Sequence, residues 1–264
     1  MIDEKPAPKE VSPTVRTAGR LAEVFSGIQG EGPFVGRRQI FIRLRGCNLN
    51  CSFCDTPEAR NQLGSCRLER TPGLRDFRTI PNPVSTQAVL DAVAALNTPV
   101  GLHHSVVLTG GEPLVQVQWA AEIARGLRKL GLPVLLETNG SLPDNLATVL
   151  PLIDLVSMDV KLPSSTGERD LFDEHARFLR AASEKDVYVK IVVASSTRIE
   201  ELCKAAGIVR KVNPGIVVVL QPVSEVGNVR APRPEQVLAW QAKCAEQLRD
   251  VRVIPQCHKI LGQL

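Results

Sequence analysis

Three cysteines stand close together in the segment GCNLNCSFCDT, and their spacing is the clearest chemical signal in the sequence. Three residues separate Cys47 from Cys51 and two separate Cys51 from Cys54, whereas the other four of the seven cysteines stand alone. Iron–sulfur clusters are held by cysteine thiolates, and a cubane cluster normally takes four of them. Three thiolates from one short loop therefore predict a cubane cluster with one iron left open to a substrate or cofactor.

Zinc is the alternative metal for this loop. A structural zinc ion normally takes four protein ligands, so a zinc site here would need a fourth side chain. The candidates for that side chain are His103, His104 and His258. In that case, the loop would belong to a metal-binding module without catalytic activity.

Further polar motifs each follow a short apolar run: TGGEP at 109–113, ETNG at 137–140, SMDVK at 157–161 and QPVSE at 221–225. Unbroken runs of Val, Ile and Leu are typical of parallel strands that are buried on both faces. The carboxyl ends of parallel strands meet at one edge of a sheet or barrel, and ligands bind there. We therefore expect these motifs and the cysteine loop to converge on one site.

An alternation of strands and helices must bring these motifs together. Six parallel strands predict an α/β fold with a partial (β/α)6 barrel, open or partly closed. Residues 57–84 carry four prolines and many charges, which predicts an irregular insertion after the cysteine loop. We expect strands at 21–25, 38–46, 106–108, 134–136, 155–158, 187–193, 216–220 and 251–255, and helices at 117–130, 144–150, 168–182, 198–211, 235–248 and from Ser85 or Thr86 onward.

Length and composition limit the class of protein. The 264 residues are 44% hydrophobic, enough for one large core, so we expect a disordered tail at 1–19 and a single domain at 20–264. The net charge is +4 without a run of Lys and Arg, which argues against a nucleic-acid partner. Apolar runs are too short to span a membrane, and the odd number of cysteines favours a reducing cytoplasm over a disulfide framework.

The cysteine spacing, with Phe53 before the last cysteine and TGGEP further on, resembles the radical S-adenosylmethionine (SAM) superfamily. The sharper resemblance is to the 7-carboxy-7-deazaguanine synthase family, on FSGIQGEGPFVGRRQIFIRLRGCNLNCSFCDT, TGGEP, ETNGS and QCHKILG. It covers the chain from about residue 20 to its end, apart from the 57–84 insertion. The resemblance implies a radical SAM domain with a 4Fe-4S cluster on Cys47, Cys51 and Cys54, SAM, Mg²⁺, an electron donor such as flavodoxin and a homodimer.

The activity implied by the resemblance is that of a carbon–nitrogen lyase in queuosine and other 7-deazapurine biosynthesis. A 5′-deoxyadenosyl radical would take hydrogen from carbon 6 of 6-carboxy-5,6,7,8-tetrahydropterin. The substrate radical would contract its ring, take the hydrogen back and lose ammonia to give 7-carboxy-7-deazaguanine. SAM would be regenerated, so the catalytic group is the cluster with its cofactor, and the side chains position the ligands.

The resemblance also implies which residues contact SAM. Gly110, Gly111 and Glu112 would line the methionine end, because glycines let the backbone approach closely and a carboxylate can receive an ammonium group. Carboxylate and amide side chains at the next strand end suit the ribose hydroxyls. The expected SAM contacts are Phe53, Cys54, Asp55, Gly111, Glu112, Glu137, Asn139, Ser157, Asp159, Lys161 and Gln221.

Substrate contacts follow from the same resemblance. The Glu31 carboxylate can accept hydrogen bonds from an amino-pyrimidine edge, and the Arg43 guanidinium can pair with a substrate carboxylate. Thr56 would bind Mg²⁺ together with substrate oxygens and water. The expected substrate contacts are Ile28, Gln29, Gly30, Glu31, Arg43, Thr109, His258 and Leu264.

The end of the chain is expected to fold into the substrate pocket. The terminal carboxylate of Leu264 would supplement Glu31, with Ile260 and Leu261 anchoring the segment in the core and Gly262 permitting an inward turn. The family commonly ends in proline, and this chain ends in leucine.

A second enzyme class shares some of these motifs. Glycyl-radical activating enzymes have the cysteine trio and a sequence like MDVK at 158–161, but they act on a backbone glycine of a protein. They usually carry an aspartate–glycine–proline–glycine motif where this chain has QGEGPFVG, and Asn where this chain has Asp55 and Thr56.

Overall fold

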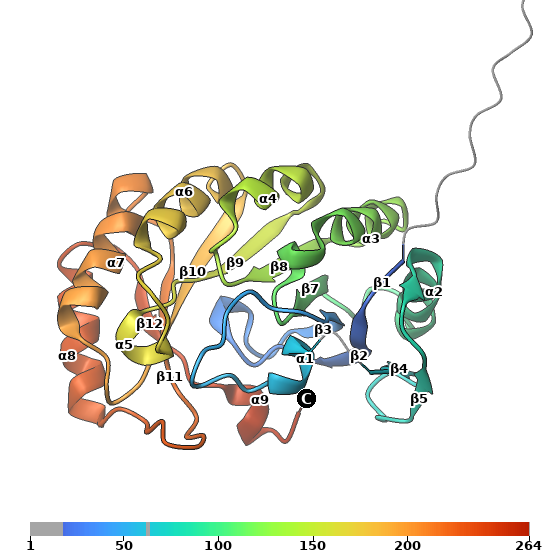
Figure 1. Ribbon diagram of the computed structural model, residues 1–264, viewed down its shortest axis with the longest axis horizontal. Helices are drawn as coiled ribbons and strands as arrows, with labels where there is room; N and C mark the ends of the chain where they lie inside the picture. The colour runs from blue at the N-terminus through green and yellow to red at the C-terminus, as the bar shows by residue number, and fades with distance from the viewer. Residues whose placement is uncertain (1–17, 62–63, 264) are drawn as a thin grey trace, which may run out of the picture.

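A sheet of ten strands forms the framework of the protein, seen in the computed structural model of Figure 1, which describes residues 18–61 and 64–263. Its strand order is β12-β11-β10-β9-β8-β7-β3-β2-β4-β5. The strands from β3 to β12 in this order are parallel to one another, and β2 runs antiparallel to β3. Their bounds are β2 Leu21–Ile28, β3 Arg38–Leu44, β7 Val106–Gly110, β8 Val134–Thr138, β9 Leu155–Asp159, β10 Asp186–Val193, β11 Val218–Pro222 and β12 Val251–Val253.

The helices form an outer layer around this curved sheet (Figure 1). Because successive parallel strands are neighbours and their crossovers are right-handed, all crossover helices fall on the same face. The longer helices are α2 Thr86–Leu96, α3 Val117–Lys129, α4 Pro143–Val149, α6 Phe172–Ala182, α7 Ile199–Val212 and α8 Pro234–Ala245. The short ones are α1 Pro57–Arg60, α5 Pro163–Thr166, α9 Cys257–Ile260 and the 3₁₀ turns η1 Gly32–Phe34, η2 Pro113–Gln116 and η3 Leu150–Leu152.

Each strand divides its side chains between two environments. In β3, Ile40 and Ile42 belong to the main core under the helices, whereas Phe41 points to the inner face and packs with Val107 and Leu135. Further along the same inner face, polar side chains replace these apolar ones: Arg43 in β3 pairs in register with Thr109 in β7. The inner face is therefore apolar at one end and polar at the carboxyl ends of the strands.

The predicted partial barrel is confirmed. Within the described residues the edge strands β12 and β5 each have one neighbour, so the barrel does not close. The strand predicted at 251–255 becomes β12, a seventh parallel strand beyond the six expected.

The insertion differs in part from the irregular segment that the sequence predicted. Besides α1, it contains β4 Cys66–Glu69 and β5 Phe77–Ile80, an antiparallel pair whose β4 extends the sheet beside β2, and β6 Val84–Ser85. The alternation in β4, with Cys66 and Leu68 buried and Arg67 exposed, is that of a strand with one face on the core. Four residues amid prolines and charges are too few for that pattern to stand out.

The predicted tail, 1–19, lies mostly outside the described residues. Its last two residues are ordered, because Ala18–Gly19 forms β1 and pairs with β6. The described domain therefore begins slightly earlier than the predicted boundary at residue 20. No described helix has the length and apolar character needed to cross a membrane.

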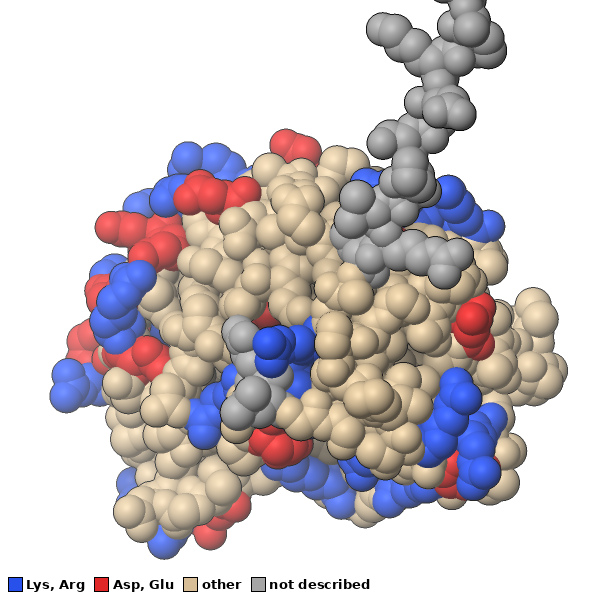
Figure 2. Space-filling view, turned by 45° about the vertical axis from the view of Figure 1, so that its right-hand side comes forward, with Lys and Arg blue, Asp and Glu red and all other residues tan. Residues whose placement is uncertain are grey.

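The visible surface carries charges of both signs. In Figure 2, Lys and Arg side chains alternate with Asp and Glu side chains around the rim, and this face shows no broad area of positive charge alone.

Candidate active site

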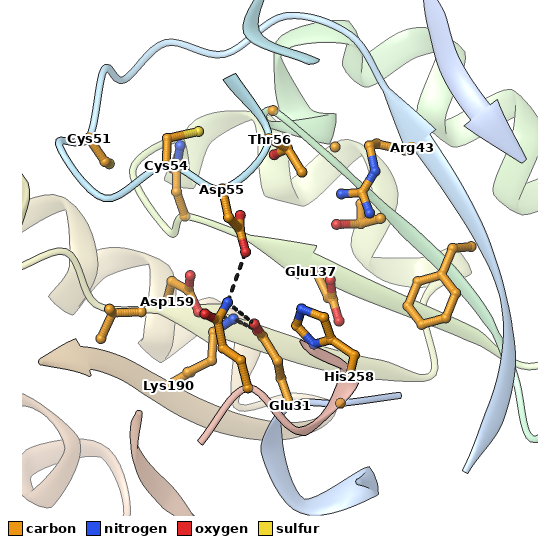
Figure 3. A pocket seen from close by; sticks show the side chains of 18 of the residues that line it. Glu31, Arg43, Cys51, Cys54, Asp55, Thr56, Glu137, Asp159, Lys190 and His258 are labelled. Atoms are coloured by element: carbon orange, nitrogen blue, oxygen red, sulfur yellow. Dashed lines mark hydrogen bonds and ion pairs between the residues drawn. The ribbon is translucent and has the colours of Figure 1, made fainter. Parts of the chain in front are cut away.

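A cavity of about 390 Å³ opens at the carboxyl ends of the parallel strands. Its wall combines the inner face of the sheet, the cysteine loop and the C-terminal segment 256–263, as Figure 3 shows in part. The motifs that the sequence predicted to converge therefore do meet around one cavity. The predicted residues in the wall are Ile28, Gln29, Gly30, Glu31, Arg43, Cys47, Cys51, Phe53, Cys54, Asp55, Thr56, Thr109, Gly110, Gly111, Glu137, Asn139, Asp159, Lys161, Gln221 and His258.

The glycine pair at the end of β7 allows the cysteine loop to lie against the sheet. A Cβ atom on Gly111 would fall 2.3 Å from the Gly46 carbonyl oxygen and 2.9 Å from the Cys47 Cβ. Gly110 has φ of +148°, and a Cβ there would fall 2.2 Å from the Leu44 carbonyl oxygen. Any side chain at either position would push the cysteine loop away from the strand end.

The three cysteines of the loop are half-buried, free of disulfides and directed toward the cavity. Burial raises the pKa of the Cys47 and Cys51 thiols above the usual range. Four ligands around one zinc ion bring their sulfurs to within about 4 Å of one another. Among the described residues, no three cysteine sulfurs come within 4.8 Å of one another. The described cysteines are therefore not grouped around one small ion, and thiolates are the donors that iron–sulfur clusters take.

The histidines considered for a zinc site lie elsewhere. His103 is buried with its Nε2 atom 2.8 Å from Ser26 Oγ, and His104 packs against the Phe34 ring at 5.0 Å. His258 does reach the cavity, but its ring lies near Glu31 and Asp55. Among the described residues, no cysteine and histidine therefore belong to one group of three or more ligands spaced for a metal ion.

Glu112 occupies a different position from the one expected. Its side chain is completely buried and does not line the cavity. One carboxylate oxygen accepts hydrogen bonds from Leu114 N (3.0 Å) and Thr138 Oγ1 (2.9 Å), and the other accepts one from Asn139 N (2.7 Å). Burial raises the pKa of Glu112 to about 7 despite these three donors. Glu112 therefore ties the end of β7 to the end of β8, and its expected contact with SAM stays a prediction.

One other expected contact, Ser157, also falls outside the wall. It is buried at 2% exposure and lies in register with Glu137 and Tyr188. Leu264 lies outside the described residues, so the structure does not show its carboxylate. Gln263, the last described residue, does line the cavity.

The Glu31 carboxylate is the most heavily bonded acid in the wall. It accepts hydrogen bonds from Gln221 Nε2 (3.0 Å) and Gln256 Nε2 (2.9 Å) and forms an ion pair with Lys190 (Figure 3). Burial by itself would raise the pKa of Glu31, but the Lys190 ammonium and the amide donors lower it to about 2. Glu31 is therefore a fixed negative charge at neutral pH.

Lys190 and Gln256 were not predicted from the sequence. Lys190 also lies 3.2 Å from Asp159, which in turn pairs with Lys161 at 2.7 Å. This row of alternating charges runs from Glu31 on one side of the cavity to Lys161 on the other. The Lys161 Nζ atom lies 5.6 Å from the centre of the Phe53 ring. The one available signal for Lys190 was its position inside the apolar strand VYVKIVV, where a charge needs buried partners.

Arg43 is held by a buried acid that the sequence also did not reveal. Glu23 Oε1 accepts from Arg43 Nε at 2.9 Å, and Glu23 Oε2 accepts from Arg67 Nη2 at 2.5 Å. The Glu23 side chain is 9% exposed, so this carboxylate is shared almost without water. Because Glu23 occupies the Nε edge of Arg43, the terminal nitrogens of the guanidinium remain available to the cavity.

The described residues contain one group of hard ligands spaced for a metal ion. Oxygen or nitrogen atoms of Glu31, Asp55 and His258 all lie within 4.8 Å of one another. Gln256 Nε2 also donates to Asp55 Oδ2 at 2.8 Å, so the cysteine loop and the C-terminal segment are joined here. Thr56 lines the cavity next to Asp55.

Comparisons with known proteins agree with this geometry. The model of the radical SAM superfamily matches residues 41–195. The chain is 42% identical over 259 residues to the 7-carboxy-7-deazaguanine synthase of Geobacter sulfurreducens, covering 94% of this chain and 99% of the relative. It is 38% identical over 244 residues to the 7-carboxy-7-deazaguanine synthase of Methanopyrus kandleri, covering 90% and 92%. The crystal structure of QueE from Escherichia coli superposes with a TM-score of 0.60 at 22% identity over 91% of this chain and 95% of that chain, a likeness of fold.

Proposed function

The chain belongs to the radical SAM superfamily and, within it, to the 7-carboxy-7-deazaguanine synthase family, and we propose that it converts 6-carboxy-5,6,7,8-tetrahydropterin to 7-carboxy-7-deazaguanine with loss of ammonia. The reaction would serve queuosine or another 7-deazapurine pathway. The observation that carries this proposal is a single cavity whose wall holds the cysteine trio on one side and Glu31, Arg43 and His258 on the other.

Membership of the superfamily implies a 4Fe-4S cluster and SAM. Cys47, Cys51 and Cys54 would hold the cluster, which supplies the electron that cleaves the sulfonium bond of SAM. Asn139 Nδ2 lies 4.0 Å from Cys47 Sγ and donates to Asn48 Oδ1 at 3.0 Å, which fixes the side of the loop that faces β8. For the SAM site we propose the lining residues Phe53, Asp55, Gly111, Glu137, Asn139, Asp159, Lys161 and Gln221.

We propose that Glu31 reads the amino-pyrimidine edge of the substrate. Its backbone N–H donates to Gln29 Oε1 at 3.0 Å, and Gln29 Nε2 donates to Gln39 Oε1 and Glu137 Oε1, both at 2.9 Å. This chain of bonds fixes the loop that carries Glu31 against the sheet. A carboxylate that stays ionised at neutral pH is a strong acceptor for paired N–H donors, as a pterin or guanine edge presents.

The remaining substrate contacts form a wall of opposite charge. We propose that the Arg43 guanidinium pairs with the carboxylate of the substrate. Ile28, Gln29, Gly30, Thr109 and His258 would complete the pocket, and Leu264 would close it from the end of the chain. Burial lowers the pKa of His258 more than the nearby Glu31 and Asp55 raise it, so this imidazole is neutral above mildly acidic pH and can accept or donate a hydrogen bond.

We further propose that Mg²⁺ binds at Thr56 with substrate oxygens and water, as a hard ion with few protein ligands does. The nearby group of Glu31, Asp55 and His258 supports an affinity for a divalent cation on this side of the cavity. The family resemblance also leads us to propose a single radical SAM domain, a homodimer, a cytoplasmic location and an electron donor such as flavodoxin. Light scattering of the purified protein would test the dimer.

The decisive experiment is anaerobic reconstitution followed by incubation with SAM, a reductant, Mg²⁺ and 6-carboxy-5,6,7,8-tetrahydropterin. We expect 7-carboxy-7-deazaguanine as the product, identified by mass spectrometry. The variant Glu31→Ala should lose this turnover but retain slow cleavage of SAM without substrate. Turnover in Glu31→Ala at the wild-type Michaelis constant would contradict the proposed role of Glu31 and favour a different substrate.

A further inference from the structure

The C-terminal segment carries Gln256 and His258 into the cavity wall, yet it has no hydrophobic anchor. Helix α9 contains no buried residue. Ile260 and Leu261, which were expected to anchor it in the core, are 77% and 57% exposed. A single helical turn is not stable by itself. The position of this segment must therefore depend on polar contacts with the rest of the protein.

The start of the segment is attached to the loop that carries Glu31. Cys257 N donates to the Gly30 carbonyl oxygen at 2.9 Å, and Gln256 Nε2 donates to both Glu31 and Asp55. Gly30 lets the two backbones meet, because a Cβ atom there would fall 2.3 Å from His258 N. Together with an ion pair between Lys259 and Asp55 (3.7 Å), these contacts hold the first half of the segment and not its last residues.

The other end of the segment is attached to the insertion. The Arg75 guanidinium, in the turn between β4 and β5, donates a hydrogen bond to the Gly262 carbonyl oxygen. Residues 66–80 thus reach the last turn of the chain, although the two are far apart in sequence.

The turn that presents Arg75 is itself specifically built. Arg75 has φ of +59°, a left-handed conformation that costs a non-glycine residue about 1 kcal/mol. The Glu69 side chain, 3% exposed, compensates by accepting hydrogen bonds from Arg75 N (2.8 Å), Gly73 N (3.1 Å) and Ser26 N of β2 (2.8 Å). One buried carboxylate therefore fixes the turn to the strand that leads to Gln29 and Glu31.

We propose that the insertion acts as a clamp on the C-terminal segment, with Arg75 as a positioning residue for His258 and the end of the chain. Arg75 need not touch the substrate: it holds Gly262 so that the segment stays folded over the cavity. The consequence for substrate affinity rests on the proposed function, whereas the attachment of the segment does not. The insertion thereby supports the substrate pocket.

The test compares three variants of the full-length protein. Arg75→Gly removes the guanidinium while suiting the positive φ, so the turn itself is preserved or stabilised. Arg75→Lys keeps a cation at the same place. Arg78→Ala is the matched control, because Arg78 is an arginine of the neighbouring strand β5, pairs in register with Leu68 of β4 and lies outside the cavity wall.

The first measurement is amide hydrogen exchange in residues 257–263. The reporters are Cys257 N, bonded to Gly30, and Leu261 N and Gln263 N, bonded within the segment to Cys257 and His258. We expect exchange to become about tenfold faster in Arg75→Gly, because a hydrogen bond to a charged donor is lost, and to be partly restored in Arg75→Lys. Unchanged exchange in Arg75→Gly, or an equal increase in Arg78→Ala, would overturn the clamp.

The second measurement is steady-state kinetics with 6-carboxy-5,6,7,8-tetrahydropterin. We expect Arg75→Gly to raise the Michaelis constant about tenfold with little change in kcat, and to leave substrate-independent SAM cleavage unaltered. Faster exchange with an unchanged Michaelis constant would overturn the role of the clamp in substrate binding. If the wild-type protein does not act on the pterin, the proposed function fails, and the exchange data still decide whether Arg75 holds the segment.

Discussion

Two buried glutamates of this site differ in charge because they face different groups. Burial opposes ionisation of both side chains. Glu31 also faces the Lys190 ammonium, so its pKa falls to about 2. Glu112 faces neutral hydroxyl and amide donors at close range, so burial prevails and its pKa rises to about 7. The first is suited to bind a ligand as an anion, and the second to connect two strand ends.

The three cysteines of the loop differ from the isolated cysteines because they share one cavity. We expect Cys51→Ala to abolish binding of the iron–sulfur cluster, because two thiolates of the trio cannot replace the third. Iron and sulfide analysis after anaerobic purification measures this. Cys203→Ala, on helix α7 outside the cavity, is the matched control and should retain the full cluster content. A normal iron content in Cys51→Ala would contradict the assignment.

Glu23 should control how Arg43 meets the substrate. In Glu23→Gln an NH2 group replaces one carboxylate oxygen and faces a guanidinium group, which is also a donor. The variant therefore loses the negative charge that pairs with both Arg43 and Arg67. We expect the Michaelis constant for the pterin to rise about tenfold or more, because a buried ion pair is lost, while SAM cleavage without substrate is retained. Glu122→Gln, which removes an exposed pair with Arg125, serves as control and should change nothing. Equal kinetics for the two variants would show that Glu23 does not orient Arg43.

At the scale of elements, helix α6 braces the ends of two neighbouring strands through one histidine. His175, fully buried, accepts a hydrogen bond from Lys161 N at Nε2 (3.0 Å) and donates from Nδ1 to the Gly140 carbonyl oxygen (3.1 Å). Gly140 follows β8 and Lys161 follows β9, so the ring sets the spacing of the loops that carry Asn139 and Lys161 into the cavity. Only the neutral ring can make both bonds, and burial lowers the pKa of His175 to about 4.

This brace predicts a pH dependence of stability. The unfolded protein binds a proton at His175 near pH 6.5 and the folded protein only near pH 4, so acidification through this window favours unfolding. We expect the free energy of unfolding to fall by roughly 2 kcal/mol from pH 7 to pH 5 because of His175 alone. Urea unfolding of the wild type and of His175→Gln at both pH values measures the difference. Equal losses in the two proteins would show that other groups cause the acid sensitivity.

At the scale of the whole molecule, the cavity depends on both ends of the described chain. β2 brings Glu23 and the loop with Glu31, the middle strands bring Glu137, Asp159 and Lys190, and the last segment brings His258. The wall of the cavity therefore draws on elements from the whole described chain rather than on two neighbouring ones. This arrangement explains why a short C-terminal segment without a buried hydrophobic residue can matter to the site.

A tag at the end of the chain should therefore disturb the site, unlike one at its start. We expect a few residues added after Leu264 to raise the Michaelis constant for the pterin strongly, because Gln263 already lines the cavity. An extension of the same length and sequence before Met1 should leave the kinetics unchanged. Identical Michaelis constants for the two extended proteins would place the chain end outside the pocket.

The sequence by itself determined the order of the parallel strands and of the helices between them, the cysteine loop and the strand-end motifs. It could do so because buried parallel strands need continuous apolar runs, and because cysteines at close spacing have few uses. It also indicated that these motifs share one edge, since the topology of a parallel sheet leaves them no alternative. Glu31, Arg43 and His258 entered through the resemblance to a family rather than through any local pattern.

Only the tertiary structure decided which polar groups face which. Lys190, Gln256 and Glu23 reach the cavity through partners far away in sequence, and no local pattern records such pairings. The resemblance assigned Glu112 to the ligand, and the structure adds that its oxygens accept hydrogen bonds from Leu114 N in η2, Thr138 Oγ1 in β8 and Asn139 N just after β8. Whether a side chain serves the ligand or the fold depends on the hydrogen-bond donors and charges that surround it, and packing supplies these from the whole chain.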